Sequence, residues 1–188
     1  MANKGAVIVK RDINGGPPLQ FFFPEAATQT FKAGKAVYLN GSGHVADFAA
    51  GIDSGSQRLL GFAAQGGNNL TTAATANAAN TGTYQSQLKG LAGLTGVYIT
   101  PYTIFEANIS SNGSDVTSLL TYPGTYLPLY EDATNGWNYI DVANTGSKID
   151  CVNVLKPAGD QYTVGETNQR FEFTLNPLAI QVGGAVAI

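Results

Sequence analysis

Short runs of strand-forming residues recur along the chain, and this pattern most limits the fold that the sequence can adopt. Each run holds four to seven β-branched, aromatic or aliphatic residues and ends at Gly, Asn, Asp or Pro. Examples are AVIVKR, AVYL, GVYITP, WNYIDV and RFEFTL. No long stretch repeats its apolar residues with a helical period. The sequence therefore predicts an all-β protein with a small β-barrel or sandwich-like body.

One hairpin is indicated by Asn135-Gly136, which separates YLPLYED from WNYIDV. Asn-Gly between two strand-like runs is the strongest short-range hairpin signal, because both residues tolerate a positive φ. Pro128 lies inside the first of these runs. Proline cannot donate a ladder hydrogen bond, so this run is expected at a sheet edge or a bulge.

The stretch 35–51, KAVYLNGSGHVADFAAG, supports two interpretations. Gly41 and Gly43 begin a G-x-G-x-x-A spacing, which in a dinucleotide-binding protein cradles a pyrophosphate. Such a site also needs an acidic residue about 20 positions further on, to bind the ribose. Residues 54–105 contain neither Asp nor Glu. We therefore expect a hairpin whose turn is formed by residues 40–43, and no phosphate site.

The chain carries little charge. Only 12% of its 188 residues are charged, against about 25% in a typical soluble domain. The net charge of −3 and the absence of a basic stripe argue against a nucleic-acid partner. Low charge with 23 glycines suits a β-protein that packs against neighbours, and a glycine-rich secreted β-domain would have the same composition. The N-terminal 35 residues are mildly basic, and Lys10 and Arg11 belong to this part.

Cys151 is the only cysteine, so the chain can form neither an internal disulfide nor a cysteine-based zinc site. This fits synthesis in the cytoplasm. The apolar AVIV at residues 6–9 is too short for a signal peptide. The C-terminal LAIQVGGAVAI is shorter than the roughly 20 residues of a membrane span. We expect no membrane association.

Residues suited to catalysis are scarce. His44 is the only histidine, and no G-x-S-x-G elbow or phosphate-binding loop occurs. Cys151 lies beside a predicted strand and is expected to be buried. Glu131 and Asp132 are consecutive, so on a strand they point to opposite faces and cannot act as an acid–base pair. We therefore expect no catalytic, cofactor-binding or metal-binding residue, although a calcium site built from loop oxygens stays open.

Residues 1–30 are expected to form an extended N-terminal arm, because Gly-Gly-Pro-Pro precedes three consecutive phenylalanines. Neighbouring strand residues alternate faces, so these phenylalanines cannot all enter one core. They serve either as a capping strand or as an intermolecular anchor. Residues 65–96 form a long polar stretch, interpreted as a binding or inter-subunit loop. The candidate interface residues are Phe21, Phe22, Phe23, Lys10 and Arg11.

PEAATQTFKAGKAVYLNGSGHVADFAAG followed by LLGFAAQG resembles the N-terminal part of the capsid decoration, or cement, proteins of tailed bacteriophages. In that family F-x-x-G-x-x-V-Y-L, G-x-V and L-G-x-A strands succeed one another. TIFEANIS and VGETNQRFEFTL resemble its later strands. The resemblance covers most of residues 24–176. It implies a barrel-like decoration domain over residues 31–176, with residues 177–188 as a C-terminal tail.

The resemblance implies a non-enzymatic virion structural protein that binds the outer capsid surface and cements neighbouring capsomers. Its partner would be the major capsid protein, and the family often forms trimers. The protein would be made in the host cytoplasm and reside on the virion, and no cofactor is implied. Deleting residues 1–30 is expected to abolish capsid binding and leave the body folded. The alternative function is a carbohydrate-binding β-domain on a virion or cell surface, with Trp137 and Tyr139 stacking on sugars.

Overall fold

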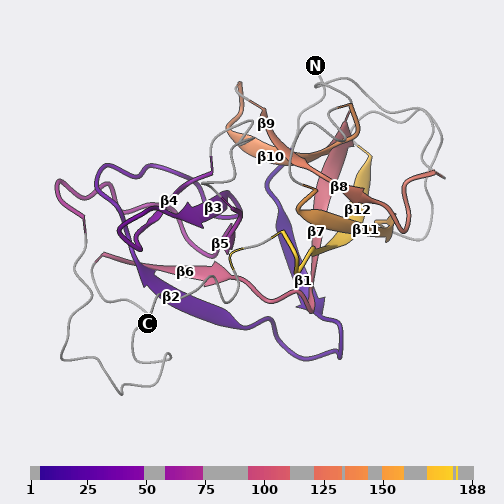
Figure 1. Ribbon diagram of the computed structural model, residues 1–188, viewed down its shortest axis with the longest axis horizontal. Helices are drawn as coiled ribbons and strands as arrows, with labels where there is room; N and C mark the ends of the chain where they lie inside the picture. The colour runs from indigo at the N-terminus through magenta and orange to yellow at the C-terminus, as the bar shows by residue number, and fades with distance from the viewer. Residues whose placement is uncertain are drawn as a thin grey trace.

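The computed structural model confirms the all-β class. It describes residues 5–48, 58–73, 93–110, 121–132, 134–143, 150–158, 169–179 and 181. Within these ranges the chain forms strands joined by turns, and no α-helix occurs. The same ranges hold no helix of the length and apolarity that crossing a membrane requires. Figure 1 shows two sheets side by side, a smaller one on the left and a larger, barrel-like one on the right.

The larger sheet has seven strands in the order β8-β11-β12-β7-β10-β9, with β1 added against β7. Its strands are β1 (Ile8–Asp12), β7 (Thr103–Ser110), β8 (Tyr126–Leu127), β9 (Leu129–Asp132), β10 (Trp137–Asp141), β11 (Val152–Pro157) and β12 (Arg170–Leu175). β10 runs parallel to β7, and the other pairs are antiparallel.

Pro128 lies between the two end strands of this nearly closed, barrel-like sheet. It separates β8 from β9, which occupy opposite ends of the strand order although they are consecutive in the chain. The proline has no N–H to donate, but its carbonyl oxygen accepts a 2.9 Å hydrogen bond from Asp141 N. The expectation that Pro128 marks a sheet edge is confirmed.

The smaller sheet has five strands in the order β2-β6-β5-β3-β4. They are β2 (Gln20–Pro24), β3 (Ala36–Leu39), β4 (Val45–Asp47), β5 (Gly61–Ala63) and β6 (Leu94–Tyr98). The sheet curls until its first and last strands meet, because Glu25 forms a parallel bridge with Val45 directly after β2. Ala26 N donates a 2.9 Å hydrogen bond to Val45 O at the same place.

The main core spans both sheets. Phe62 on β5 is fully buried, and its ring lies 4.8 Å from Phe105 on β7 and 5.8 Å from Phe173 on β12, centroid to centroid. Its neighbour Ala63 faces the other way, as strand alternation requires. Ala63 belongs to a second cluster of buried residues, which also contains Phe31, Val37, Val45, Leu60 and Val97.

The predicted β3–β4 hairpin is confirmed. Gly43 N donates to Asn40 O at 2.9 Å, and Asn40 Oδ1 accepts hydrogen bonds from the backbone N of Ser42 and His44, each at 3.0 Å. The side chain of Asn40 therefore organises the turn. The two glycines differ, because Gly43 has a φ of 76° while Gly41 does not lie in the left-handed region.

The predicted hairpin at Asn135-Gly136 is also confirmed, since Asp132 pairs with Trp137 across the turn. Asp132 plays the part that Asn40 plays in the first hairpin. Its side chain accepts hydrogen bonds from Thr134 N and Asn135 Nδ2, each at 3.0 Å.

The extended N-terminal arm predicted over residues 1–30 is described from residue 5 onward, and that part does not stand apart from the body. β1 pairs with β7 of the larger sheet and β2 pairs with β6 of the smaller one, so the segment is extended but built into both sheets. The strand-forming runs on either side of Gly-Gly-Pro-Pro satisfy their backbone groups on these sheet edges instead of in water. Deleting residues 1–30 would remove one strand from each sheet, so the expectation that the body stays folded is withdrawn.

The predicted loop 65–96 is shorter than expected, because Leu94–Tyr98 is a strand. Its beginning is fixed by Glu25, a fully buried carboxylate that accepts hydrogen bonds from Asn68 N and Nδ2, each at 2.7 Å, and from Thr95 Oγ1 at 2.6 Å. Residues 74–92 lie outside the described residues, as does most of the predicted tail 177–188.

The two hairpin glycines give a matched test of the turn. Gly43→Ala is expected to lower the free energy of unfolding by about 1–2 kcal/mol, because it places a Cβ on left-handed backbone. Gly41→Ala is expected to change it by less than about 0.5 kcal/mol, because an added Cβ there meets nothing within 4 Å. Urea unfolding measures both, and equal effects would contradict the assigned turn.

Candidate functional site

A buried lysine lies where the two sheets meet. Lys35, directly before β3, is only 2% exposed. Its Nζ lies 2.8 Å from Glu131 Oε1 on β9 and 3.5 Å from Asp47 Oδ1 on β4. One cation thus links a carboxylate of the larger sheet to one of the smaller sheet.

The turn before β3 positions Lys35. Gly34 has a φ of 80°, and a Cβ at this position would lie 2.6 Å from the carbonyl oxygen of Val7. Only glycine lets the turn approach the N-terminal segment so closely. The next residue strengthens the link between the sheets, because Ala36 N donates a 2.8 Å hydrogen bond to the buried Asn138 Oδ1 on β10.

A pocket of about 240 Å³ opens beside Lys35. It is lined by residues of the turn 30–35, by Asp47 and Glu131, and by residues 134–136 of the β9–β10 turn. At its rim, Lys32 Nζ lies 4.9 Å from the centre of the Trp137 ring and 3.3 Å from Asn135 O. The pocket therefore combines a buried ammonium group, two carboxylates and a cation held over an aromatic ring.

The charges of the pocket balance. Lys32 and Lys35 stand against Asp47 and Glu131. Burial raises the pKa of Asp47 above its ordinary value, although the nearby Lys35 acts to lower it. Because Lys35 lies between the two carboxylates, the arrangement holds charges in place and leaves no isolated acid–base pair.

Lys10 and Arg11, two predicted interface residues, are paired within the molecule. A bulge in β1 between Val9 and Arg11 lets both side chains reach glutamates of the larger sheet. Lys10 Nζ lies 3.1 Å from Glu106 Oε2, and Arg11 Nη1 lies 3.8 Å from Glu172 Oε1. They do not form a free basic patch.

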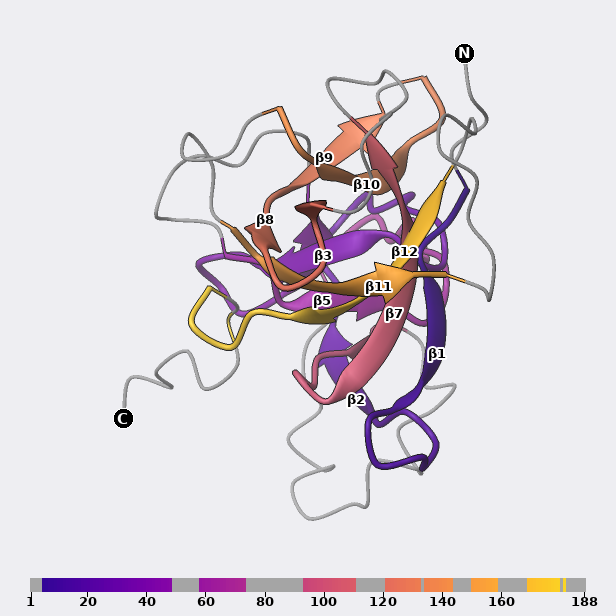
Figure 2. The same ribbon diagram turned by 90° about the vertical axis from the view of Figure 1, so that its right-hand side faces the viewer.

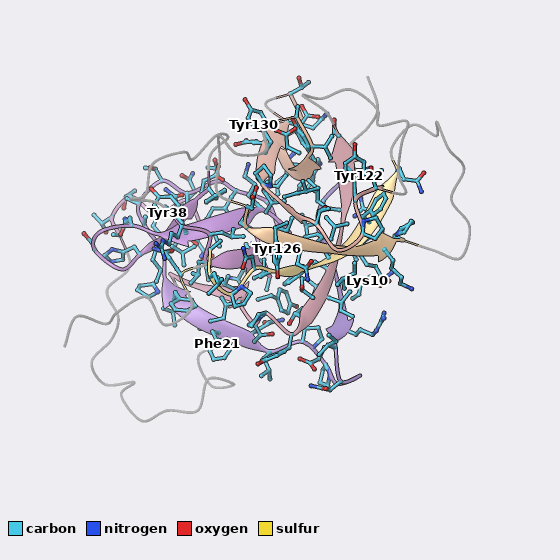
Figure 3. The ribbon with its side chains drawn as sticks, turned by 45° about the vertical axis from the view of Figure 1, so that its right-hand side comes forward. Lys10, Phe21, Tyr38, Tyr122, Tyr126 and Tyr130 are labelled. Atoms are coloured by element: carbon cyan, nitrogen blue, oxygen red, sulfur yellow. The ribbon has the colours of Figure 1, made fainter. Side chains whose placement is uncertain are left out.

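The other predicted interface residues, Phe21, Phe22 and Phe23, lie on β2 and are all half-buried. Phe23 packs against the cluster around Phe31, whereas the ring of Phe22 covers Gly96 on β6. Figure 3 shows Phe21 on β2, far from Lys10 in that view. The structure does not bring the aromatic and basic candidates together into one site.

The two residues considered for catalysis, Cys151 and His44, lie in a buried position and in a hairpin turn. Cys151 is 2% exposed, as expected, and burial raises the pKa of its thiol to about 12. His44 lies in the β3–β4 turn, where its backbone N–H bonds to Asn40. In the described ranges no three His, Cys, Asp or Glu side chains are grouped to hold a metal ion.

The sequence reasoning missed a second group of charged residues, on the outer face of β7 and β12. Arg170 Nε donates to Glu106 Oε1 at 2.5 Å, and its Nη atoms donate to Asn108 Oδ1, Ala6 O and Glu106 O at 2.9 to 3.0 Å. The available signal was the alternation in TIFEANIS and RFEFTL, which sets these polar residues opposite core phenylalanines.

Comparison with known proteins found no match for this chain among protein families, curated proteins or solved structures.

Lys35→Met is expected to lower the free energy of unfolding by about 3 kcal/mol or more, because it leaves two carboxylates without their shared cation. Adding Glu131→Gln and Asp47→Asn should recover part of the loss. Lys156→Met is the control, since Lys156 is 58% exposed and its ion pair is long, at 3.8 Å. Urea unfolding would contradict this role if the two lysine variants were equally stable.

Glu106 should make stability depend on pH. Burial acts to raise the pKa of Glu106, but hydrogen bonds and charges from Lys10 and Arg170 outweigh it and hold the pKa below the ordinary 4.5. The ionised carboxylate therefore stabilises the fold above pH 4.5, and this stabilisation is lost as the pH falls through the lowered pKa.

Glu106→Gln should thus cost about 1–2 kcal/mol at pH 7, and the cost should shrink in more acidic buffer. Urea unfolding of both proteins across this pH range measures the difference. A difference that is independent of pH would refute the assignment.

Proposed function

We propose that this chain is a non-enzymatic virion structural protein, which binds the outer surface of a phage capsid and cements neighbouring capsomers. The observation that carries the proposal is an exposed apolar tip, formed by Ile13, Pro17, Leu19 and Tyr102. Ile13, Leu19 and Tyr102 are 54%, 57% and 61% exposed. Contiguous exposed apolar side chains are typical of protein–protein contact sites.

The tip is held in shape by its own backbone. It combines the loop between β1 and β2 with the turn between β6 and β7, which Figures 1 and 2 show at one end of the molecule. Ile13 N donates a 2.6 Å hydrogen bond to Tyr102 O, and Asp12 N donates to Gly16 O at 3.0 Å. A contact surface that is already ordered loses less conformational entropy on binding.

Charge distribution supports apolar docking. Lys10, Arg11, Lys156 and Arg170 all pair with Glu106 or Glu172, so these four basic side chains are matched within the fold. Burial of apolar surface, worth roughly 25 cal/mol per Å², would then supply the affinity. Many copies on one capsid would act together by multivalency.

We place the main contact at the tip and not at Phe21–Phe23, because the phenylalanines are half-buried in the smaller sheet. Phe21–Phe23, Lys10 and Arg11 stay candidates for the edge of the interface. The partner in this proposal is the major capsid protein, and the protein itself is a homo-oligomer, with a trimer favoured by the family resemblance. The site of action is the capsid surface, after synthesis in the host cytoplasm.

The carbohydrate-binding alternative loses its two stacking residues. Tyr139 is only 2% exposed. Lys32 covers one face of the half-buried Trp137. Neither ring is placed as an open platform for a sugar, so we do not propose binding through them.

Capsid binding is tested with capsids of the phage that encodes the protein, by co-sedimentation and by counting copies per capsid with electron microscopy. We expect wild-type protein at a fixed stoichiometry. The double variant Leu19→Asp/Tyr102→Asp should lose at least tenfold in occupancy, because it places charge in an apolar contact.

Leu178→Asp is the control, since Leu178 is an apolar residue outside the tip and is 87% exposed. It should bind like the wild type. Thermal melts check that all three proteins are folded. Wild-type protein that ignores capsids would overturn the function, and full occupancy by the double variant would overturn the role of the tip.

A further inference from the structure

We propose that the pocket beside Lys35 binds an uncharged polyhydroxyl ligand the size of one sugar ring. This site is distinct from the apolar tip, and the proposal does not rest on capsid binding. It stands on three features of the pocket: buried polar atoms without hydrogen-bond partners, balanced charge and volume.

Two buried polar atoms face the pocket without a hydrogen bond of good geometry. They are Lys35 Nζ and Asp47 Oδ1. The side chain of Lys35 is only 2% exposed. Nζ can only donate and a carboxylate oxygen can only accept. They lie 3.5 Å apart, so one hydroxyl group beside both can accept from Lys35 and donate to Asp47. Both atoms belong to ion pairs, but neither has a hydrogen bond of good geometry, so a ligand that carries hydroxyls would add the hydrogen bonds they lack.

The charge of the pocket selects against ions. Two lysines and two carboxylates line it, so its formal charge is zero. An anion drawn to Lys35 would meet Glu131 at 2.8 Å and Asp47 at 3.5 Å from the same nitrogen. A cation drawn to the carboxylates would meet Lys35 between them. A neutral molecule with several hydroxyls uses both kinds of group and incurs neither repulsion.

The volume of the pocket suits a ligand of about one ring. The pocket has a volume of about 240 Å³. This is below the 300–1,000 Å³ of typical drug-sized sites and fits a single hexose. Thr30 and Thr134 add hydroxyls to the wall, and Lys32 forms a lid over the indole of Trp137.

Trp137 gives the pocket a built-in reporter, because it is the only tryptophan of the chain and the pocket residue Lys32 lies on its ring. The full-length protein is titrated with D-glucose, D-galactose, D-mannose and N-acetyl-D-glucosamine while tryptophan fluorescence is recorded. At least one sugar should give a saturable change with a Kd in the millimolar range, as expected for a ligand of this size. Sodium phosphate and magnesium chloride are the ionic probes.

Asp47→Asn should weaken sugar binding at least tenfold, because it removes the charged acceptor, while the part-exposed position tolerates the isosteric amide. Lys156→Gln, on the outer face of β11, is the matched surface control and should bind like the wild type. Calorimetry confirms the constants independently of fluorescence. Lys35→Met is a second test, interpreted only if a thermal melt shows that it folds.

Each outcome of these titrations either supports or overturns the proposed sugar site. No saturable binding by any of the four sugars, unchanged binding by Asp47→Asn, or tighter binding of phosphate or magnesium would overturn the proposal. Binding of the free sugar alone assigns the pocket to small sugars, and binding also to immobilised glycans that end in it assigns the pocket to glycan termini. The tip variant Leu19→Asp/Tyr102→Asp should bind the sugar normally, so failure of capsid docking and failure of this site are told apart.

Discussion

The insertion of Phe62 into the larger barrel joins the two sheets, and the rest of the structure depends on it. Its ring packs against Phe105 and Phe173, so β5 contributes to a core that belongs mostly to other strands. Gly61 permits this, because a Cβ there would lie 2.0 Å from the carbonyl oxygen of Tyr98. The close approach of β5 to β6 is therefore available only to glycine. With the sheets fixed by an apolar contact, the polar groups at their boundary, Lys35 foremost, must find partners across it.

On the outer face of the larger barrel, two glutamates of neighbouring strands repel each other, and basic residues of the flanking strands compensate. Glu106 and Glu172 lie directly opposite each other on β7 and β12, and like charges in that position destabilise a sheet. Bulges in the flanking strands β1 and β11 supply the compensation. The first brings Lys10 and Arg11 to the pair, and the second places Lys156 opposite Glu172. The basic residues of this region are thereby used within the fold and do not form a free charged surface.

Local patterns predicted local structure well. Both hairpins, the sheet edge at Pro128 and the burial of Cys151 follow from turn chemistry and strand composition. The F-x-x-G-x-x-V-Y-L, G-x-V and L-G-x-A stretches supply Phe31, Val37, Val45, Leu60 and Ala63, nearly all of the second core cluster. The sequence did not predict which strands pair when they lie far apart in the chain. The strands within residues 1–30 carry no signal that names their partners, and the contact of Ala36 with Asn138 spans 102 positions. The bulges and the Lys35 pocket depend on such pairings, so no local pattern could reveal them.

The two proposed sites are compatible in space. The pocket lies between the turn 30–35 and the β9–β10 turn, and the tip belongs to the loop after β1. Figures 1 and 2 both show β9 and β10 at one end of the molecule and the β1–β2 loop at the other. A protein docked through its tip would therefore hold the pocket away from the docking surface. Sugar binding and capsid attachment could then operate together, because neither ligand would cover the residues that the other requires.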